Sequence, residues 1–395
     1  MSVAWPFIRL QGGLYFLLWD GFRWTLPPLL RFGPVHDTII NKNNQVSLEV
    51  SPCLRLFWTA ASAAPSTNSS TAISGGRSRR AIAEHLYRFR GIRADAEQIV
   101  VGAGSETLIG LLVQLLGREG GYGVENPGYT KTQRILTSCG AAVRPLPLDG
   151  QGLRVDALEE AGVRVVHVTP SHHYPLGIIM PVARRQALLR WAEAAPDRYI
   201  LEDDYDSEFR FSGRPIPALQ SLDGGERVVY LNTFAKSLAP SLRISYMVLP
   251  PHLLERWRRD FWFYSSTVPS FEQYALARFM ERGHFERHLN RTRTRYKARR
   301  EALLAAARDT GLTRVGSFAG GDAGLHLLLW MDGRWSEAEL VARAVDAGVG
   351  VAPLSACDLT PPPPGRPPAL ILGYTRIAAV DMAPALRRLK AAWAF

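Results

Sequence analysis

The chain has 395 residues, of which 47% are hydrophobic and 21% charged, a composition typical of a globular protein with more than one domain and not of a disordered or fibrous one. The formal net charge is +11, but lysine and arginine are spread along the chain and form no compact basic tract, so the charge alone does not indicate a nucleic-acid-binding tail. The three cysteines have no CxxC spacing and no apolar run is long enough to cross a bilayer, so we expect no disulfide framework, no zinc site and no membrane segment, and a cytoplasmic protein.

Residues 1–72 have no clear helical periodicity, and the small-residue tract at 60–71 is typical of a linker. Regular elements then follow one another at short intervals. The predicted helices are 79–89, 106–116 and 184–194, and the predicted strands are 98–101, 142–146, 163–168, 199–201, 227–231 and 244–249. Strands that alternate with helices predict an α/β fold, with a mostly parallel sheet covered on both faces.

Beyond residue 250 the predicted elements are first helical, at 253–281 with a break near Val268-Pro269 and at 285–307. Strands at 325–330 and 369–374, with helices at 337–347 and 382–393, then predict a smaller α/β domain. We therefore divide the chain into an unrecognised N-terminal segment (1–72), a large domain (73–283) and a small C-terminal domain (284–395). The six arginines of 285–307 would suit a nucleic-acid-binding helix, but the apolar residues fall close to one face, which favours a solvated outer face.

Polar residues follow two apolar strands at the point where each strand ends. Residues 199–201 lead into acids at 202–208, and residues 228–231 lead into a loop that ends at Lys236. Ligands of open α/β sheets bind outside the carboxyl ends of strands, so we expect both segments to face one crevice. A lysine, a carboxylate and a phenol together suit a pyridine aldehyde: the lysine forms a Schiff base, the carboxylate keeps the ring nitrogen protonated, and the phenol bonds the ring oxygen. Because only five lysines occur in the chain, this placement favours pyridoxal 5'-phosphate bound at Lys236.

A phosphate group needs hydrogen-bond donors as well. Gly104 and Ser105 lie in a turn between a predicted strand and helix, where backbone N–H groups and the positive helix end can hold an anion. Thr233 and Arg243 flank Lys236 and can add a hydroxyl and a guanidinium. Tyr129, after the turn at 126–128, is a candidate to lie against the ring.

Each feature also has an alternative interpretation. GxGxxT at 102–107 fits a Rossmann turn or a plain strand–helix junction. A divalent-metal site is an alternative for the acids at 202–208, but no matching cluster occurs elsewhere. His172 and His173 have no third zinc ligand at a suitable spacing, so we predict no metal and expect His172 in a loop on the side of the cofactor.

Three motifs, at 169–181, 201–209 and 232–250, resemble the aminotransferase-like domain of MocR/GabR-type transcriptional regulators. Members of this family are fold-type I pyridoxal-phosphate proteins, in which that domain follows a winged helix-turn-helix of the GntR kind. The resemblance covers about residues 77–395. It implies a large domain with a seven-stranded type of sheet between helices, a smaller C-terminal domain, and a homodimer with sites near the subunit interface.

The resemblance also implies a role for each candidate residue. Lys236 corresponds to the Schiff-base lysine, Asp203 to the partner of the ring nitrogen and Tyr205 to the donor to the ring oxygen. The remaining roles are phosphate binding by Gly104, Ser105, Thr233 and Arg243, ring contact by Tyr129, and binding of a substrate carboxylate by Arg376.

The chain departs from the family pattern in three places. Lys131 stands where these regulators usually have an arginine of the carboxylate clamp, and Ala235 stands where they have serine. Residues 1–70 resemble neither a winged helix nor the segment that leads into the aminotransferase domain. DNA binding is therefore expected only with an N-terminal reader domain.

Three functions remain open from the sequence. The first is a sensor in which an amino acid or amine exchanges at Lys236, as in the effector domain of these regulators. The second is a free-standing amino acid aminotransferase, and the third is an inactive relic.

Overall fold

The computed structural model describes residues 70–212 and 216–394 and four short strands near the N-terminus, and it divides into two units, 1–56 and 57–395. In the first unit, β1 (Phe7–Leu10) pairs antiparallel with β2 (Gly13–Phe16), and β3 (Leu18–Trp19) pairs with β4 (Trp24–Thr25). The linker predicted at 60–71 lies almost wholly outside the described residues.

The second unit is built on an eight-stranded sheet with the order β5-β12-β11-β10-β9-β6-β7-β8. Neighbouring strands from β11 to β7 are parallel, whereas β12, β5 and β8 pair antiparallel with their neighbours. The strands are β5 (Ile99–Gly102), β6 (Tyr122–Asn126), β7 (Val143–Asp149), β8 (Gly152–Leu153), β9 (Val165–Val168), β10 (Tyr199–Asp203), β11 (Val228–Thr233) and β12 (Ser245–Val248). The predicted α/β class is confirmed. The family resemblance implied a sheet of seven strands, and the eighth strand is the two-residue β8 at one edge.

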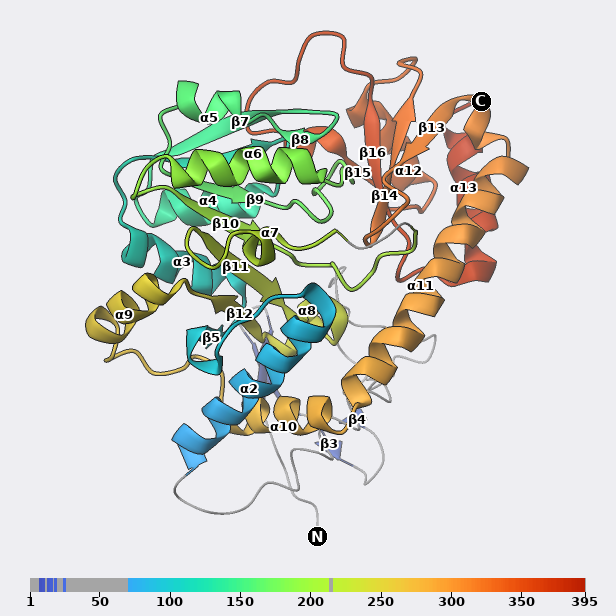
Figure 1. The fold of residues 1–395 in the computed structure, drawn as a ribbon. Coiled ribbons are helices and arrows are strands. Elements are labelled where there is room, and N and C mark those ends of the chain that lie inside the picture. The colour runs from blue at the N-terminus through green and yellow to red at the C-terminus, as the bar shows by residue number, and fades with distance from the viewer. Residues whose placement is uncertain are drawn as a thin grey trace. The chain divides into compact units, whose positions relative to one another are not determined.

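Helices cover both faces of this sheet, as the strand patterns require (Figure 1). Along β10, Leu201 packs in one core with Leu112 of α3, while its neighbour Ile200 packs in the other core with Trp191 of α6. Successive side chains of a strand point to opposite faces, so a continuous apolar run serves both cores. The helices are α2 (Ser70–Arg90), α3 (Ser105–Leu116), α4 (Thr130–Ser138), α5 (Asp156–Glu160), α6 (Val182–Glu193), α7 (Leu219–Leu222), α8 (Phe234–Ser237), α9 (Pro251–Asp260) and α10 (Ser270–Glu281).

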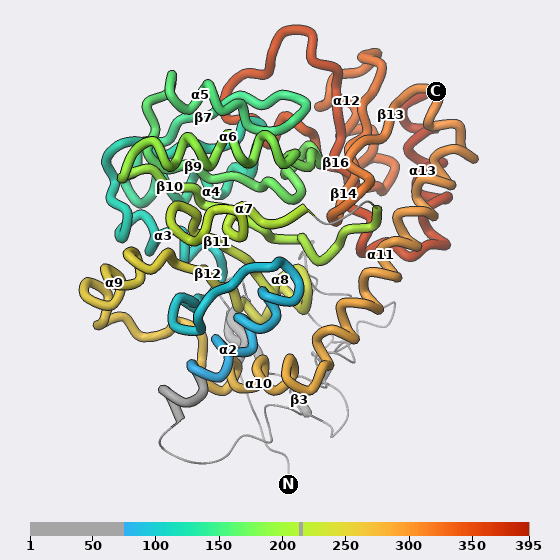
Figure 2. Tube along the Cα trace, in the orientation of Figure 1, coloured from blue at the N-terminus to red at the C-terminus, as the bar shows by residue number. Residues whose placement is uncertain are grey.

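The C-terminal part carries a second, antiparallel sheet with the order β13-β14-β16-β15. Its strands are β13 (Gly316–Ala319), β14 (His326–Met331), β15 (Ala352–Pro353) and β16 (Ala369–Gly373), and its helices are α11 (His284–Asp309), α12 (Glu337–Asp346) and α13 (Ala379–Ala392). Leu303 of α11, Leu329 of β14 and the buried Trp393 share one core. Figure 2 shows α11 leading from α10 to this second sheet.

Two helix predictions can be judged against these elements. The break predicted near Val268-Pro269 within 253–281 is confirmed, because Pro269 lacks the N–H group that a helix interior uses, but it is longer than predicted: residues 261–269 form a loop between α9 and α10. The solvated-face interpretation of 285–307 agrees with α11, in which Phe285, Leu289 and Leu303 are buried while Arg291 and Arg295 are exposed.

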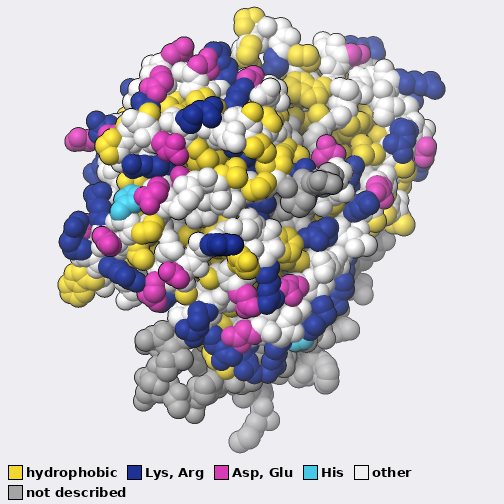
Figure 3. All heavy atoms as spheres, viewed as in Figure 1, with side chains coloured by type: hydrophobic (Ala, Val, Ile, Leu, Met, Phe, Trp, Pro, Cys, Tyr) yellow, Lys and Arg dark blue, Asp and Glu magenta, His cyan; other side chains and the backbone are white. Residues whose placement is uncertain are grey.

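Charge is distributed over the surface without a compact basic region on the face seen in Figure 3, where basic side chains alternate with acidic ones. Among the helices of the described residues, none is both long and apolar enough to cross a membrane.

Candidate functional site

The strand register brings the predicted lysine loop and the predicted phosphate turn to the same edge of the sheet. Thr233, the last residue of β11, lies opposite Ser245 of β12, and Ser245 lies opposite Gly102 of β5. Ser245 also donates a hydrogen bond from Oγ to Thr233 Oγ1 at 2.8 Å. Three segments that are far apart in the sequence therefore meet where β5 and β11 end.

Lys236 lies in the single turn of helix α8 that follows β11, and its side chain is exposed. Thr233 caps this turn, because its Oγ1 accepts the backbone N–H of Ala235 at 3.1 Å. A capped turn directly after a buried strand fixes the place of Lys236 while leaving its amine accessible.

Asp203 ends β10, the strand next to β11, and pairs in register with Leu231. Its Oδ2 lies 3.3 Å from Nε2 of His167, which comes from β9 on the other side of β10. The Asp203 side chain is 12% exposed, so it faces the crevice edge and not bulk water. The sequence analysis missed His167, although a histidine inside the apolar strand 163–168 was the available signal.

Tyr205 is held by His172, as the expected loop position of that histidine allows. The Tyr205 hydroxyl lies 3.2 Å from His172 Nδ1 and donates to the His172 carbonyl oxygen at 3.2 Å. The same Nδ1 lies 2.9 Å from Oδ2 of the buried Asp206. Burial raises the pKa of the Tyr205 phenol well above its usual range, so the phenol stays protonated and remains a donor.

The turn before α3 is shaped for an anion. Gly104 has φ 97°, and a Cβ there would clash with the Arg243 guanidinium and the Glu106 carboxylate, so only glycine fits. Arg243 Nη2 donates to Glu106 Oε2 at 2.6 Å, and Lys131 donates to the other carboxylate oxygen. Burial acts to raise the pKa of Glu106, but the bonds from Lys131 and Arg243 outweigh it and bring the pKa to about 2.

Glu106 therefore presents a carboxylate at the point where two cations meet the N-terminus of α3, together with Ser105, the first residue of that helix. This carboxylate stands in for an anionic group, and the donors around it fit the phosphate of the predicted cofactor. The structure thus places Lys131 with Arg243 on a shared carboxylate, next to the predicted phosphate turn.

An aromatic wall borders the crevice. Tyr129, 47% exposed, lies edge-on to Tyr174 with ring centroids 5.7 Å apart, and Tyr174 lies 5.2 Å from His326. His326 is in turn 5.2 Å from His172. Burial, His172 and Lys236 lower the pKa of His326 to about 4, so this ring is neutral and adds no charge to the wall.

Arg376 follows β16 and is exposed. The preceding Tyr374 is fully buried and donates from its hydroxyl to the Gly324 carbonyl oxygen at 2.6 Å, which anchors the segment. Gly324 in turn leaves room for the His172 ring, with which any Cβ at this position would clash. The segment that carries Arg376 is thereby linked to the His172 loop: Tyr374 bonds to Gly324, and Gly324 packs against the His172 ring.

Four acids of the run 202–208 point away from the crevice and are buried. Glu202 accepts the backbone N–H groups of Leu219 and Gln220, each at 2.9 Å, and so caps α7. Asp204 pairs with Arg90 at 2.7 Å, and Asp206 pairs with His172. Within residues 70–394, apart from 213–215, no group of three metal-ligating side chains occurs. Glu202, Asp204 and Asp206 instead hold neighbouring segments in place through the contacts given above.

Comparisons with known proteins show the family of this chain. Residues 42–366 match the family described as aminotransferase class I and II, so the match begins upstream of the motifs. The chain is 38% identical over 315 residues to the "Uncharacterized HTH-type transcriptional regulator YdeL" of Bacillus subtilis, covering 80% of this chain and 67% of the relative. It is 38% identical over 322 residues to the "Probable rhizopine catabolism regulatory protein MocR" of Rhizobium meliloti, covering 80% and 64%.

The fold is also that of solved aminotransferases. The structure of the multiple substrate aminotransferase of Thermococcus profundus matches with a TM-score of 0.74 over 88% of both chains at 24% identity, which shows the shared fold. The chain spans about two thirds of the length of the curated regulators it matches. The resemblance stated from three motifs is confirmed.

Proposed function

Since the chain belongs to the aminotransferase class I and II family, we propose that it senses an amino acid or amine through a cofactor held at Lys236. The cofactor of this family is pyridoxal 5'-phosphate, as the motifs predicted. The 38% identity to proteins named as transcriptional regulators supports a sensor domain over a free-standing enzyme. Binding to DNA is proposed only for a chain that carries a reader domain.

The convergence of Lys131 and Arg243 on one carboxylate carries this proposal. It provides positive charge and a helix N-terminus for a phosphate, at the edge of the sheet where Lys236 lies. We propose that the phosphate displaces the Glu106 carboxylate and takes over its donors. Lys236 follows Thr233 by three residues, in the turn that Thr233 caps.

When bound, the cofactor supplies an aldehyde that reacts reversibly with amines and a ring that withdraws electrons. We assign the amine to Lys236 and the negative charge beside the ring nitrogen to Asp203, which His167 holds in place. Tyr205, protonated and fixed by His172, would donate to the ring oxygen. Tyr129 would cover the ring, and Arg376 would hold the carboxylate of an amino acid.

We also propose a homodimer. Trp262 and Phe263, in the loop between α9 and α10, are 79% and 62% exposed, which is unusual for such large apolar side chains. Thr267 of the same loop accepts the backbone N–H of Ala103 at 2.9 Å, so the loop is tied to the phosphate turn. A second copy that covered this loop would lie beside the cofactor site. Sedimentation of Trp262→Ser should then show a shift towards monomer.

The second candidate function, a free-standing aminotransferase, is favoured by the likeness to whole aminotransferase structures, which extends over both sheets. The two candidates differ in turnover. A sensor exchanges its amine ligand and stops there, whereas an enzyme releases a keto acid.

Absorbance spectroscopy of the purified protein with a panel of amino acids tests the proposal. We expect a visible cofactor band that changes with one class of amino compound, and after borohydride reduction a pyridoxyl group on the Lys236 peptide by mass spectrometry. Lys236→Ala should lose both signals, while the matched control Lys297→Ala, exposed on α11, should keep them. Pyridoxyl found elsewhere, or a band that persists in Lys236→Ala, would contradict the assignment, and stoichiometric keto-acid release would select the enzyme.

A further inference from the structure

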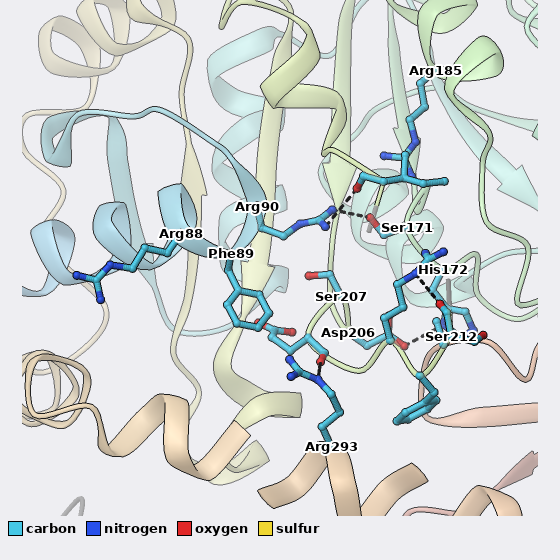
Figure 4. A pocket seen from close by; sticks show the side chains of 15 residues that line it. Arg88, Phe89, Arg90, Ser171, His172, Arg185, Asp206, Ser207, Ser212 and Arg293 are labelled. Carbon is cyan, nitrogen blue, oxygen red and sulfur yellow. Dashed lines mark hydrogen bonds and ion pairs between the residues drawn. The ribbon is translucent and has the colours of Figure 1, made fainter. Parts of the chain in front are cut away.

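A cavity of about 360 Å³ is lined by both members of the His172–Asp206 pair. It is lined by the end of α2, the segment that follows β10, and α11 (Figure 4). Lys236, Asp203, Gly104 and Arg243 do not line it. At roughly 30 Å³ per water molecule, this volume has room for a ligand of about ten non-hydrogen atoms.

The cavity wall is rich in arginine, and most of these arginines are already neutralised. Arg90 pairs with Asp204 at 2.7 Å, and Arg88 pairs with Glu84. Arg185 lies 3.9 Å from Glu202.

Arg210 and Arg293 differ, because neither has a carboxylate within 4 Å in the described part of the chain. Arg293 donates from Nε to the Glu208 carbonyl oxygen at 2.9 Å and from Nη1 to Asn290 Oδ1 at 3.2 Å. Figure 4 shows its guanidinium reaching into the cavity.

One oxygen of a buried acid on the same wall also lacks a hydrogen-bond partner. Glu208 is 4% exposed, and its Oε2 accepts or donates no hydrogen bond among the described residues. Burial raises the pKa of Glu208 to about 8, so at neutral pH this carboxyl is mostly protonated. A protonated carboxyl adds no negative charge to the wall that carries Arg293.

Apolar surface completes the lining. Phe89 lies under the Arg293 guanidinium, 5.4 Å from it, and Phe211 and Ala323 belong to the same wall. Two guanidinium groups without a carboxylate partner, in a wall that also carries aromatic rings, suit a molecule with a negatively charged head and an apolar body.

We propose that this cavity is a binding site for a small organic carboxylate, whose charged group meets Arg293 and Arg210 while its body packs against Phe89 and Phe211. The site is separate from the substrate carboxylate position proposed at Arg376. Binding at this cavity needs no cofactor, so its test does not depend on whether the proposed function is correct.

Isothermal titration calorimetry with sodium benzoate, and with benzamide as the neutral isostere, tests this site. We expect saturable benzoate binding and benzamide binding weaker by about tenfold or more, because only the carboxylate forms charge-assisted hydrogen bonds. Arg293→Gln should weaken benzoate binding by about tenfold or more. The matched control Arg295→Gln, exposed on the same helix, should leave it unchanged.

Two further variants separate this cavity from the cofactor site. Benzoate binding should persist in Lys236→Ala and in Arg376→Gln. Loss of binding in Arg376→Gln with retention in Arg293→Gln would overturn the proposal, as would absence of saturable binding at millimolar benzoate or equal affinity for benzamide.

Arg293 also bonds to the backbone of Glu208, so its replacement could disturb folding. Ala323→Leu provides an independent variant, because Ala323 is 5% exposed and a larger side chain there fills cavity space. Near-UV circular dichroism checks that each variant is folded. If Ala323→Leu is folded and binds benzoate as the unmodified protein does, the cavity does not hold the ligand and the proposal fails.

Discussion

The two sides of the segment 202–208 differ in almost every physical respect. Asp203 and Tyr205 point to the crevice, are partly exposed and contact histidines. Glu202, Asp204 and Glu208 are buried; Glu202 accepts backbone N–H groups and Asp204 pairs with Arg90, whereas Oε2 of Glu208 has no hydrogen-bond partner among the described residues. Glu202 and Asp203 are neighbours in β10, where successive side chains face opposite sides, and residues 205–208 form a turn after that strand, so one acidic run supplies two layers.

The difference separates reactive positions from the supports that hold them. The proposed reactive groups Lys236, Tyr129 and Arg376 have accessible side chains, which a ligand can reach. The buried residues behind them, among them Glu202 and Asp204, form what we call the rear layer. Water does not screen the charges of this layer, so removing one partner of an ion pair there lowers the free energy of unfolding strongly. Variants of the rear layer should therefore change stability, and variants of the crevice should change ligand and cofactor binding.

The largest effect is expected for Arg90→Met, which leaves Asp204 buried without its cation. Removing one partner of a buried pair destabilises a protein by about 3–5 kcal/mol. Urea unfolding followed by circular dichroism measures this loss, with exposed Arg295→Met as the control. If Arg90→Met lowers the free energy of unfolding no more than the control does, the rear layer is not the support described above.

A pH-dependent effect is expected for Glu208→Gln. The folded-state pKa of Glu208 is raised to about 8 from an ordinary value of 4.5, so the folded protein binds a proton that the unfolded chain releases. Stability from this group is complete below pH 4.5 and is lost as the pH rises towards 8. The glutamine variant lacks this loss, so relative to the unmodified protein it should gain about 3–4 kcal/mol between pH 5 and pH 8. If the free energies of unfolding of the two proteins differ by the same amount at every pH from 5 to 8, the assignment is contradicted.

The sequence identified the front layer better than the rear one. Lys236 and Asp203 were predicted because each follows a buried apolar strand, and neighbouring strands of a parallel sheet end at the same edge. The phosphate turn was predicted from Gly104 and Ser105 because a strand-to-helix junction needs little tertiary information. These signals are local, and local signals can be read from one segment.

The rear layer depends on partners that only the folded chain brings together. Arg90 and Asp204 are 114 positions apart, and the α7 backbone that Glu202 caps is itself a four-residue helix without periodicity. β6 was missed because Gly123 and a buried Glu125 interrupt its apolar pattern, and Glu125 is accommodated by Thr169 on another strand end. Likewise, nothing near Glu106 in the sequence indicated that its carboxylate would gather Lys131 and Arg243.

In the front layer, Gly104→Ala should weaken cofactor binding by about tenfold to a hundredfold. Its φ of 97° is unfavourable for alanine, and the added Cβ would displace the Arg243 guanidinium. Fluorescence titration of apoprotein with pyridoxal 5'-phosphate measures the dissociation constant. Gly150→Ala is the matched control, since a Cβ there meets nothing within 4 Å. Equal dissociation constants for the two variants would show that the turn does not carry the phosphate.

The smallest effect is expected where the two layers meet, at His172. His172 Nδ1 lies 2.9 Å from Asp206 Oδ2 and 3.2 Å from the Tyr205 oxygen, so an N–H at this nitrogen donates towards both. That donation makes the phenol a better donor to the ring oxygen of the cofactor and favours the ionised form of that oxygen. His172→Phe should therefore raise the pH midpoint of the visible absorbance change by about one unit. His252→Phe, a histidine on α9, serves as the control, and an unchanged midpoint in folded His172→Phe would mean that His172 only fills space beside Gly324.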